Sequence, residues 1–200
     1  MSKVFIPSMS EDFWKTPQIS ITRYARSGGG YSPSVKVFLA RGERRICVGF
    51  DTRETPAATR YKEDGMPVYK DSAVEMFLKP FDGDARYLNL EFNSSCAAVF
   101  GFGDGKNDRE ELVRKYKKSL NASAAVSRKN WKIYFEIPFE IIGEIYGKKF
   151  CPFTETVKAN FFKCGDETPF PHYGSAFPIP LDYPEFHRPQ YFGEMIFLKT

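Results

Sequence analysis

The chain has 200 residues, 42% hydrophobic and 16% aromatic, which is enough to fill one core and unlike the composition of a disordered chain. Its 29 Lys and Arg residues against 25 Asp and Glu residues give a formal net charge of +4, and its densest basic run, residues 114–118, is short and interrupted. We therefore expect one domain over residues 1–200 and no nucleic-acid partner.

The sequence carries no targeting signal that we can identify. No apolar stretch is long enough to span a membrane, and Lys3 is not followed by the apolar region of a signal peptide. We expect no membrane partner. Two locations stay open, inside the cell or outside it after loss of a signal, and the oligomeric state also stays open.

The four cysteines, Cys47, Cys96, Cys151 and Cys164, form no Cys-x-x-Cys pair, and this spacing excludes a zinc ribbon. We expect all four to be free structural thiols, because a buried thiol packs as a small hydrophobe. The two histidines, His172 and His187, have no metal-ligand spacing, so packing or loop hydrogen bonding is expected of them and no metal site is assigned.

Short alternating segments with turn signals between them follow an irregular start that ends near Lys15. The predicted strands are residues 19–24, 35–40, 45–51, 71–79, 87–93, 97–102, 131–137, 157–163 and 194–198. Two short helices are predicted, roughly over residues 109–118 and from Pro138 to near Gly147, and a loop is expected at residues 28–30. Many strands without a strand–helix–strand rhythm predict an all-β protein, an antiparallel β-sandwich of jelly-roll-like form.

One predicted hairpin is rich in polar side chains. Side chains alternate between the two faces of a strand, so Val74 and Glu75 point in opposite directions. The apolar set is Ser72, Val74, Met76, Leu78, Leu88, Leu90 and Phe92, and the opposite set is Asp71, Ala73, Glu75, Phe77, Lys79, Tyr87, Asn89, Glu91 and Asn93. Because a one-residue slip would bury the polar set, Glu75 should lie opposite Asn89, Glu91 or Asn93.

This polar face has two interpretations. Carboxylates and amides bind vicinal hydroxyls, and a nearby aromatic ring covers the apolar face of a sugar, so the face suits a carbohydrate. The same pattern is also that of an ordinary solvated sheet face. On an open face we expect Glu75 to keep a pKa near 4, which favours a role in binding over one in catalysis.

Four segments resemble carbohydrate-binding module family 9. Residues 67–75, Pro-Val-Tyr-Lys-Asp-Ser-Ala-Val-Glu, resemble the family's Asp-Ser block, and residues 87–93 look like the strand after it. Residues 159–166 and 186–193 are similar to blocks of a bacterial family 9-like subgroup. The resemblance implies a bacterial β-sandwich of polysaccharide metabolism that binds mono- or oligosaccharides, or polysaccharide chain ends, without cleaving them.

The resemblance also implies which residues hold the sugar. Tyr69 and Phe177 match two rings that enclose it, where tryptophan is usual, and we expect them at one exposed site beside Glu75. The full ligand-binding set expected is Tyr69, Asp71, Glu75, Asn89, Glu91, Asn93, Asn160 and Phe177. No cofactor is expected with certainty, although family members often hold a structural calcium ion.

Two other functions stay open. Glu75 and Glu91 could serve as the acid and the nucleophile of a glycoside hydrolase, since retaining enzymes hold two carboxyl groups about 5 Å apart. The sandwich could also be a protein-interaction domain, because a fold does not determine a function.

Overall fold

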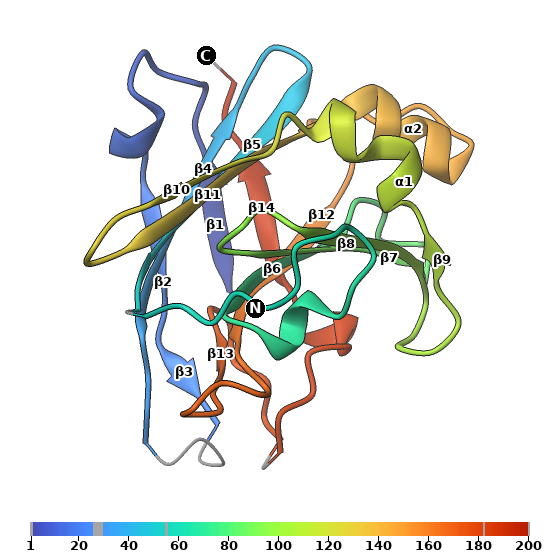
Figure 1. Cartoon of the computed structure of the whole chain (residues 1–200). Coiled ribbons are helices and arrows are strands. Elements are labelled where there is room, and N and C mark those ends of the chain that lie inside the picture. Colours follow the sequence, from blue (N-terminus) through green and yellow to red (C-terminus); the bar gives the residue numbers. More distant parts are fainter. Residues whose placement is uncertain (1, 26–29, 55, 182, 200) are drawn as a thin grey trace.

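Two β-sheets lie face to face in the computed structural model, which describes residues 2–25, 30–54, 56–181 and 183–199 (Figure 1). The nine-stranded sheet has the order β1 (Lys3–Ile6), β14 (Gly193–Phe197), β12 (Val157–Cys164), β6 (Ala73–Lys79), β7 (Tyr87–Asn93), β8 (Ala98–Gly103) and β9 (Glu110–Glu111). Beside this path, β13 (Tyr173–Ser175) pairs with β12 and with β3 (Arg23–Tyr24).

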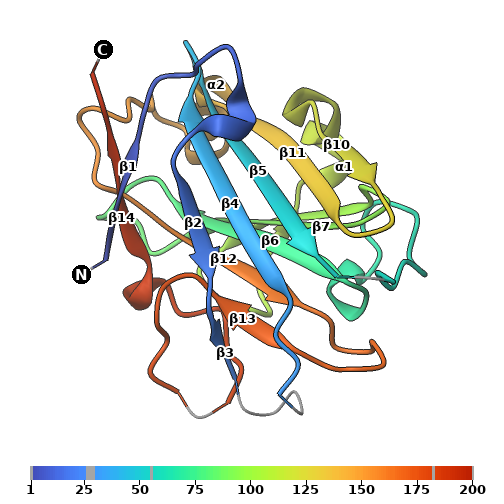
Figure 2. The ribbon, with the colours of Figure 1, turned by 90° about the vertical axis from the view of Figure 1, so that its left-hand side faces the viewer.

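The five-stranded sheet has the order β10 (Ser123–Val126), β11 (Trp131–Pro138), β5 (Arg45–Arg53), β4 (Ser34–Arg41) and β2 (Gln18–Ile21). Figure 2 shows this sheet in front, with β6, β7 and β12 of the other sheet crossing behind it. The predicted all-β sandwich is confirmed, with one difference. The β1–β14 pair is parallel, and β1 lies in a stretch that was expected to be irregular.

Most strands agree with the sequence, and the departures have local causes. The strand predicted over residues 19–24 divides at Thr22, where the chain leaves the five-stranded sheet as β2 and joins the nine-stranded sheet as β3. Such a switch makes a corner of a sandwich. The short strands β9, β10 and β13 were not predicted, and β9 occupies Glu110–Glu111, where the sequence predicted the start of a helix. The loop expected at residues 28–30 falls largely outside the described residues.

Both predicted helices are present and short. Helix α1 spans Val113–Tyr116 and continues as a 3₁₀ turn, Lys117–Leu120. Helix α2 spans Phe139–Tyr146 and ends at Gly147, whose φ of 67° is the left-handed conformation that glycine accepts at a helix C-terminus. Further 3₁₀ turns are Phe13–Lys15, Val68–Lys70 and Pro189–Tyr191. No helix of the described residues is long and apolar enough to cross a membrane.

The core lies between the two sheets and uses the apolar faces that the alternation predicted. Val74, Met76, Leu90 and Phe92 are all buried there. Phe135 of β11 bridges the sheets, since its ring stacks on Phe92 of β7 with centroids 4.7 Å apart. The four cysteines are all free thiols, as expected.

A buried ion pair lies at one end of the core. Lys163 Nζ is 3.1 Å from Glu54 Oε2, and neither side chain is more than 4% exposed. His172 Nε2 is 2.6 Å from the same Nζ, and Trp131 Nε1 donates to Glu54 Oε2. Burial and the Lys163 charge lower the pKa of His172 to about 4, so the ring is neutral and accepts from the ammonium.

Replacing Phe135 by Ala should destabilise the fold by about 3–5 kcal/mol, because it removes the ring that joins the sheets and leaves a cavity. Urea unfolding monitored by circular dichroism would measure the change. As a matched control, Phe153→Ala at an exposed ring should change stability by less than about 0.5 kcal/mol. Equal effects of the two variants would contradict the assignment of Phe135 to the core.

Replacing Lys163 by Met should cost about 3–5 kcal/mol, because it leaves the Glu54 carboxylate buried without its cation. Adding Glu54→Gln to the same chain should recover most of that loss, since no buried charge then remains. A double-mutant cycle in urea checks this expectation. If the two single losses simply add, the pair is not coupled and the interpretation is wrong.

Candidate functional site

A cavity of about 310 Å³ lies on the outer face of the nine-stranded sheet. Its floor is formed by Glu75 of β6, Glu91 of β7 and Cys164 of β12. Its walls are the loop between β8 and β9, the 3₁₀ turn before β6 and the segment after β12. The wall residues are Tyr69, Lys106, Asn107, Arg109, Asp166, Tyr173, Pro184, Glu185, Phe186 and His187.

The outer face is covered because it carries a second apolar cluster. Phe77, Tyr87 and Phe162 project outward from their strands and pack with Phe192. Phe186 stacks on Phe162 with centroids 4.2 Å apart. This contact holds the C-terminal segment, residues 183–192, against the sheet. This segment, drawn in orange-red, lies below β6 in Figure 1. The expectation of an open, solvated face is therefore wrong, since these outward rings need a cover.

Glu75 and Glu91 are direct cross-strand partners, one of the three pairings that the sequence allowed. Each residue is only 4% exposed. Cys164 Sγ donates to Glu75 Oε1 at 2.8 Å, and Asn89 Nδ2 donates to Glu91 Oε1 at 3.0 Å. Glu91 Oε2 is buried and has no hydrogen-bond partner among the described residues. Two carboxyl groups thus meet at the cavity floor with bonding capacity left over.

Burial sets the protonation of this pair. It raises the pKa of Glu75 well above its ordinary value, and the Glu91 carboxylate beside it raises this pKa further. Burial also raises the pKa of Glu91, against the hydrogen bond from Asn89 and the charge of Arg109. The expected pKa near 4 for Glu75 is therefore wrong, because the carboxyl is covered. The pair keeps protons to a higher pH than two solvated carboxyls would.

The walls hold rings and cations over the acidic floor. Tyr69 is 39% exposed, on the turn Val68–Lys70, and Tyr173 is half-buried. Arg109 donates to Asn89 Oδ1, so the guanidinium lies over the amide that also bonds Glu91. The imidazole of His187 bonds the Tyr87 hydroxyl through Nδ1 at 2.6 Å. Burial lowers the pKa of His187 to about 3, so the ring is neutral.

The structure brings together only part of the predicted ligand-binding set. Tyr69, Glu75 and Glu91 line the cavity, and Asn89 lies beneath it, bonded to Glu91. The other four predicted residues, Asp71, Asn93, Asn160 and Phe177, do not line it. Each of them makes a contact within the protein instead.

Asp71 and Asn93 fasten the segment before β6. The Asp71 carboxylate is fully buried and accepts from the backbone N–H groups of Arg60 and Tyr61 at 2.7 and 2.8 Å. Asn93 Nδ2 donates to the Tyr61 carbonyl at 2.6 Å. These bonds use the polar atoms of both side chains within the fold, which leaves them away from the cavity.

Asn160 and Phe177 form another structural contact. The Phe177 backbone N–H donates to Asn160 Oδ1 at 3.0 Å, which turns the ring into the core against Phe161. The ring packs on Gly193, where a Cβ atom would lie 2.5 Å from Phe177 Cε2. Phe177 is 7% exposed, so the prediction that it shares one exposed site with Tyr69 is wrong.

The sequence did not predict most of the residues that line the cavity. Cys164, Asp166, Phe186 and His187 lie in segments that resemble family blocks, so a signal for them was present. Lys106 and Arg109 carry no such signal. They reach the cavity because β7, β8 and β9 pair in order and return the β8–β9 loop beside β7.

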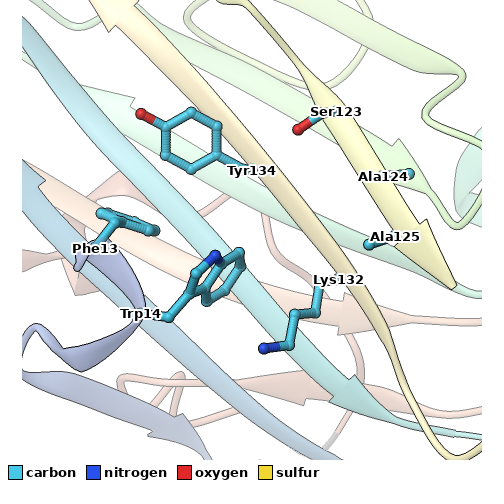
Figure 3. A pocket seen from close by; sticks show the side chains of 7 residues that line it. All are labelled: Phe13, Trp14, Ser123, Ala124, Ala125, Lys132 and Tyr134. Atoms are coloured by element: carbon cyan, nitrogen blue, oxygen red, sulfur yellow. The ribbon is translucent and has the colours of Figure 1, made fainter. Parts of the chain in front are cut away.

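A second hollow, of about 360 Å³, lies on the outer face of the five-stranded sheet (Figure 3). Its aromatic side chains are engaged with their own neighbours. Trp14 packs edge-on with Phe13 and Phe38 at 5.3 and 5.2 Å, and Lys132 Nζ lies 4.4 Å from its ring centroid. It has no buried carboxyl pair like that of the first cavity, which is therefore the stronger candidate site.

The described residues form no side-chain cluster for the structural calcium ion that family members often hold. Among residues 2–25, 30–54, 56–181 and 183–199, no group of three or more His, Cys, Asp or Glu side chains converges as a metal site. Calcium prefers six to eight oxygen ligands, several of them carboxylates. The described side chains therefore do not fit such a site.

The chain resembles proteins of one carbohydrate-binding family. The sequence profile of carbohydrate-binding family 9 matches residues 9–197. A candidate carbohydrate-binding protein from Bacteroides uniformis has a TM-score of 0.85 to this chain at 22% identity, covering 98% of this chain and 99% of that chain. None of the curated proteins is significantly similar to this chain in sequence.

Two solved structures of a family 9 module from Caldicellulosiruptor kristjanssonii are also similar, both at 13% identity. The complex with cellotriose has a TM-score of 0.69 and covers 98% of this chain and 93% of that chain. The complex with glucose has a TM-score of 0.70 and covers 100% and 97%. At these identities the likeness establishes the fold. Because the profile matches nearly the whole sequence, this chain belongs to carbohydrate-binding family 9.

Proposed function

We propose that the chain binds a small saccharide, or the end of a polysaccharide chain, without cleaving it, in the cavity above Glu75 and Glu91. The observation that carries the proposal is the buried carboxyl pair, in which Glu91 Oε2 has no partner among the described residues, beneath a rim of aromatic rings. Sugar hydroxyls supply the missing donors. A cavity of about 310 Å³ is at the small end for ligand sites, which suits a short ligand.

The cavity residues take distinct roles in this proposal. Glu75 and Glu91 accept from hydroxyl groups, and the guanidinium of Arg109 donates to a sugar oxygen. The exposed ring of Tyr69 covers an apolar sugar face at the rim. The Caldicellulosiruptor modules were solved with glucose and cellotriose, so these are the first ligands to test.

Glycoside hydrolysis is the second candidate, because burial and a close like charge give Glu75 the raised pKa of a general acid. The arrangement of the pair argues against it. The two carboxyls are cross-strand neighbours on one floor, whereas a glycosidase places its two carboxyls on either side of the bond that it cleaves.

Calorimetric titration with glucose, cellotriose and hits from a glycan array tests the proposal. Tyr69→Ala should weaken binding by about 1–3 kcal/mol, the scale of one lost aromatic contact. Glu75→Gln should also weaken it, because an amide is a poorer acceptor than a carboxylate. Phe153→Ala, at an exposed ring outside the cavity, should leave the affinity unchanged.

Reducing-sugar release by the purified chain separates the two candidates. We expect none above the blank with any bound oligosaccharide. Release that Glu75→Gln abolishes would replace the binding assignment by a hydrolase. If no carbohydrate binds and none is cleaved, the proposed function is wrong.

The acid pair also predicts how stability depends on pH. Above the ordinary Glu value of 4.5, the folded chain holds more protons on Glu75 and Glu91 than the unfolded chain does. Their contribution to stability is therefore full below about pH 4.5 and is lost as the pH rises through the raised pKa values. Glu75→Gln has no such proton to lose, so its Tm relative to the native chain should increase from about pH 5 to about pH 8.

Thermal melts of paired samples measure this difference at each pH. His172 and His187, whose pKa values are lowered, act in the opposite direction but are present in both chains and cancel. The control is Glu43→Gln in the exposed turn between β4 and β5, whose Tm difference from the native chain should stay constant. A constant difference for Glu75→Gln as well would mean that the carboxyl is not buried in solution.

A further inference from the structure

The cavity holds more acidic than basic groups. Its lining includes four carboxyl groups and two permanent cations, which are Glu75, Glu91, Asp166 and Glu185 against Lys106 and Arg109. His187 is neutral. The acidic excess lies deepest, since Glu75 and Glu91 are the buried members while Lys106 is exposed and Arg109 half-buried. The ionisable groups at the cavity floor are therefore acidic, and a cationic ligand would favour their ionised form.

The two cations do not neutralise the buried pair. Arg109 donates through Nε to the Lys106 carbonyl and through Nη1 to Asn89 Oδ1. Within the part of the chain that the structure describes, neither Glu75 nor Glu91 forms an ion pair with a Lys, Arg or His side chain. Their donors are a thiol and an amide, which are both uncharged groups. The pair at the floor thus has no positively charged partner among the described residues.

The unpartnered oxygen of Glu91 shows where that charge would lie. Glu91 is 4% exposed and lines the cavity, and its Oε2 atom is buried without a hydrogen bond among the described residues. Glu75 faces it across the β6–β7 pair, with one oxygen held by Cys164. A ligand atom between the two carboxyls would need to donate in two directions. A hydroxyl group has a single proton to donate, whereas a protonated amine has three and also carries a charge.

We propose that the saccharide bound in this cavity is an amino sugar, and that its protonated amino group lies between Glu75 and Glu91. This inference rests on the proposed function, because it identifies the ligand of the same site. A hydrogen bond from a charged donor is roughly twice as strong as one between neutral groups. Burial raises the pKa values of both carboxyl groups, and a cation between them favours their ionised form and reduces the repulsion between the two charges, which a neutral hydroxyl does not. A metal ion fits less well, since no group of three or more His, Cys, Asp or Glu side chains among the described residues could hold one.

Calorimetry on the full chain at about pH 6, where a sugar amine is protonated, tests the inference with three matched disaccharides. These are β-1,4-linked glucosamine, its N-acetylated form and cellobiose, which differ at C2. The glucosamine disaccharide should bind about tenfold more tightly than cellobiose, a difference of about 1.4 kcal/mol. The N-acetylated form should lose this advantage, because an amide carries no charge. Free lysine should bind far more weakly, since it lacks the sugar ring.

Two variants show whether the preference comes from the pair. Glu91→Gln should reduce the preference for glucosamine to within about twofold while cellobiose still binds. Glu185→Gln changes a carboxyl on the cavity wall and should keep most of the preference. The amide oxygen of the variant can still accept from the backbone N–H group of His187. Loss of the preference in Glu185→Gln but not in Glu91→Gln would overturn the assignment to the floor.

The possible results separate the inference from the proposed function. Equal affinity of the native chain for cellobiose and for the glucosamine disaccharide would overturn the inference and leave the proposed function standing. Equal binding of lysine and the amino sugar would also overturn it. If none of the saccharides binds, the proposed function fails and the inference fails with it. The native-chain comparison alone decides the matter even where a variant does not fold.

Discussion

The direct pairing of Glu75 with Glu91 is the constraint on which the site depends. On the other face of the same strands Val74 and Phe92 enter the core, and a slip by one residue would expose them. The apolar alternation that stabilises the sandwich thus keeps both carboxyls on the outer face, although their repulsion and burial cost stability. The C-terminal segment then covers them, since Phe162 and its outward neighbours also need to be buried.

The sequence predicted what depends on alternation. The faces of Val74 and Glu75, and the three possible partners of Glu75, follow from strand geometry alone. The choice among those partners does not, because residues 80–86 connect β6 to β7 and form a longer loop than the two-residue hairpin loop that would set a register. The burial of Glu75 could not be predicted either. It depends on Phe186, about a hundred positions along the chain, in a segment without regular structure.

Local position separates the two rings that the resemblance singled out. Tyr69 lines the cavity because the turn that carries it directly precedes β6, whose register was constrained. Phe177 does not line it, because the direction of its ring depends on one hydrogen bond to Asn160 and on the space above Gly193. Arg109 was missed because nothing near it in sequence indicates that its loop returns to β7. Local patterns thus identify the floor of the site, and tertiary contacts determine its walls.

Strand β12 connects the site to the core beneath it. Successive side chains of a strand point to opposite faces, so Cys164 donates to Glu75 in the cavity while Lys163 lies in the core with Glu54 and His172. The Lys163 ammonium thus lies behind the acid pair, and the Glu75 charge is among those that raise its pKa against burial. Because charges are weakly screened in a buried setting, this cation offsets part of the negative potential of the floor without entering the cavity.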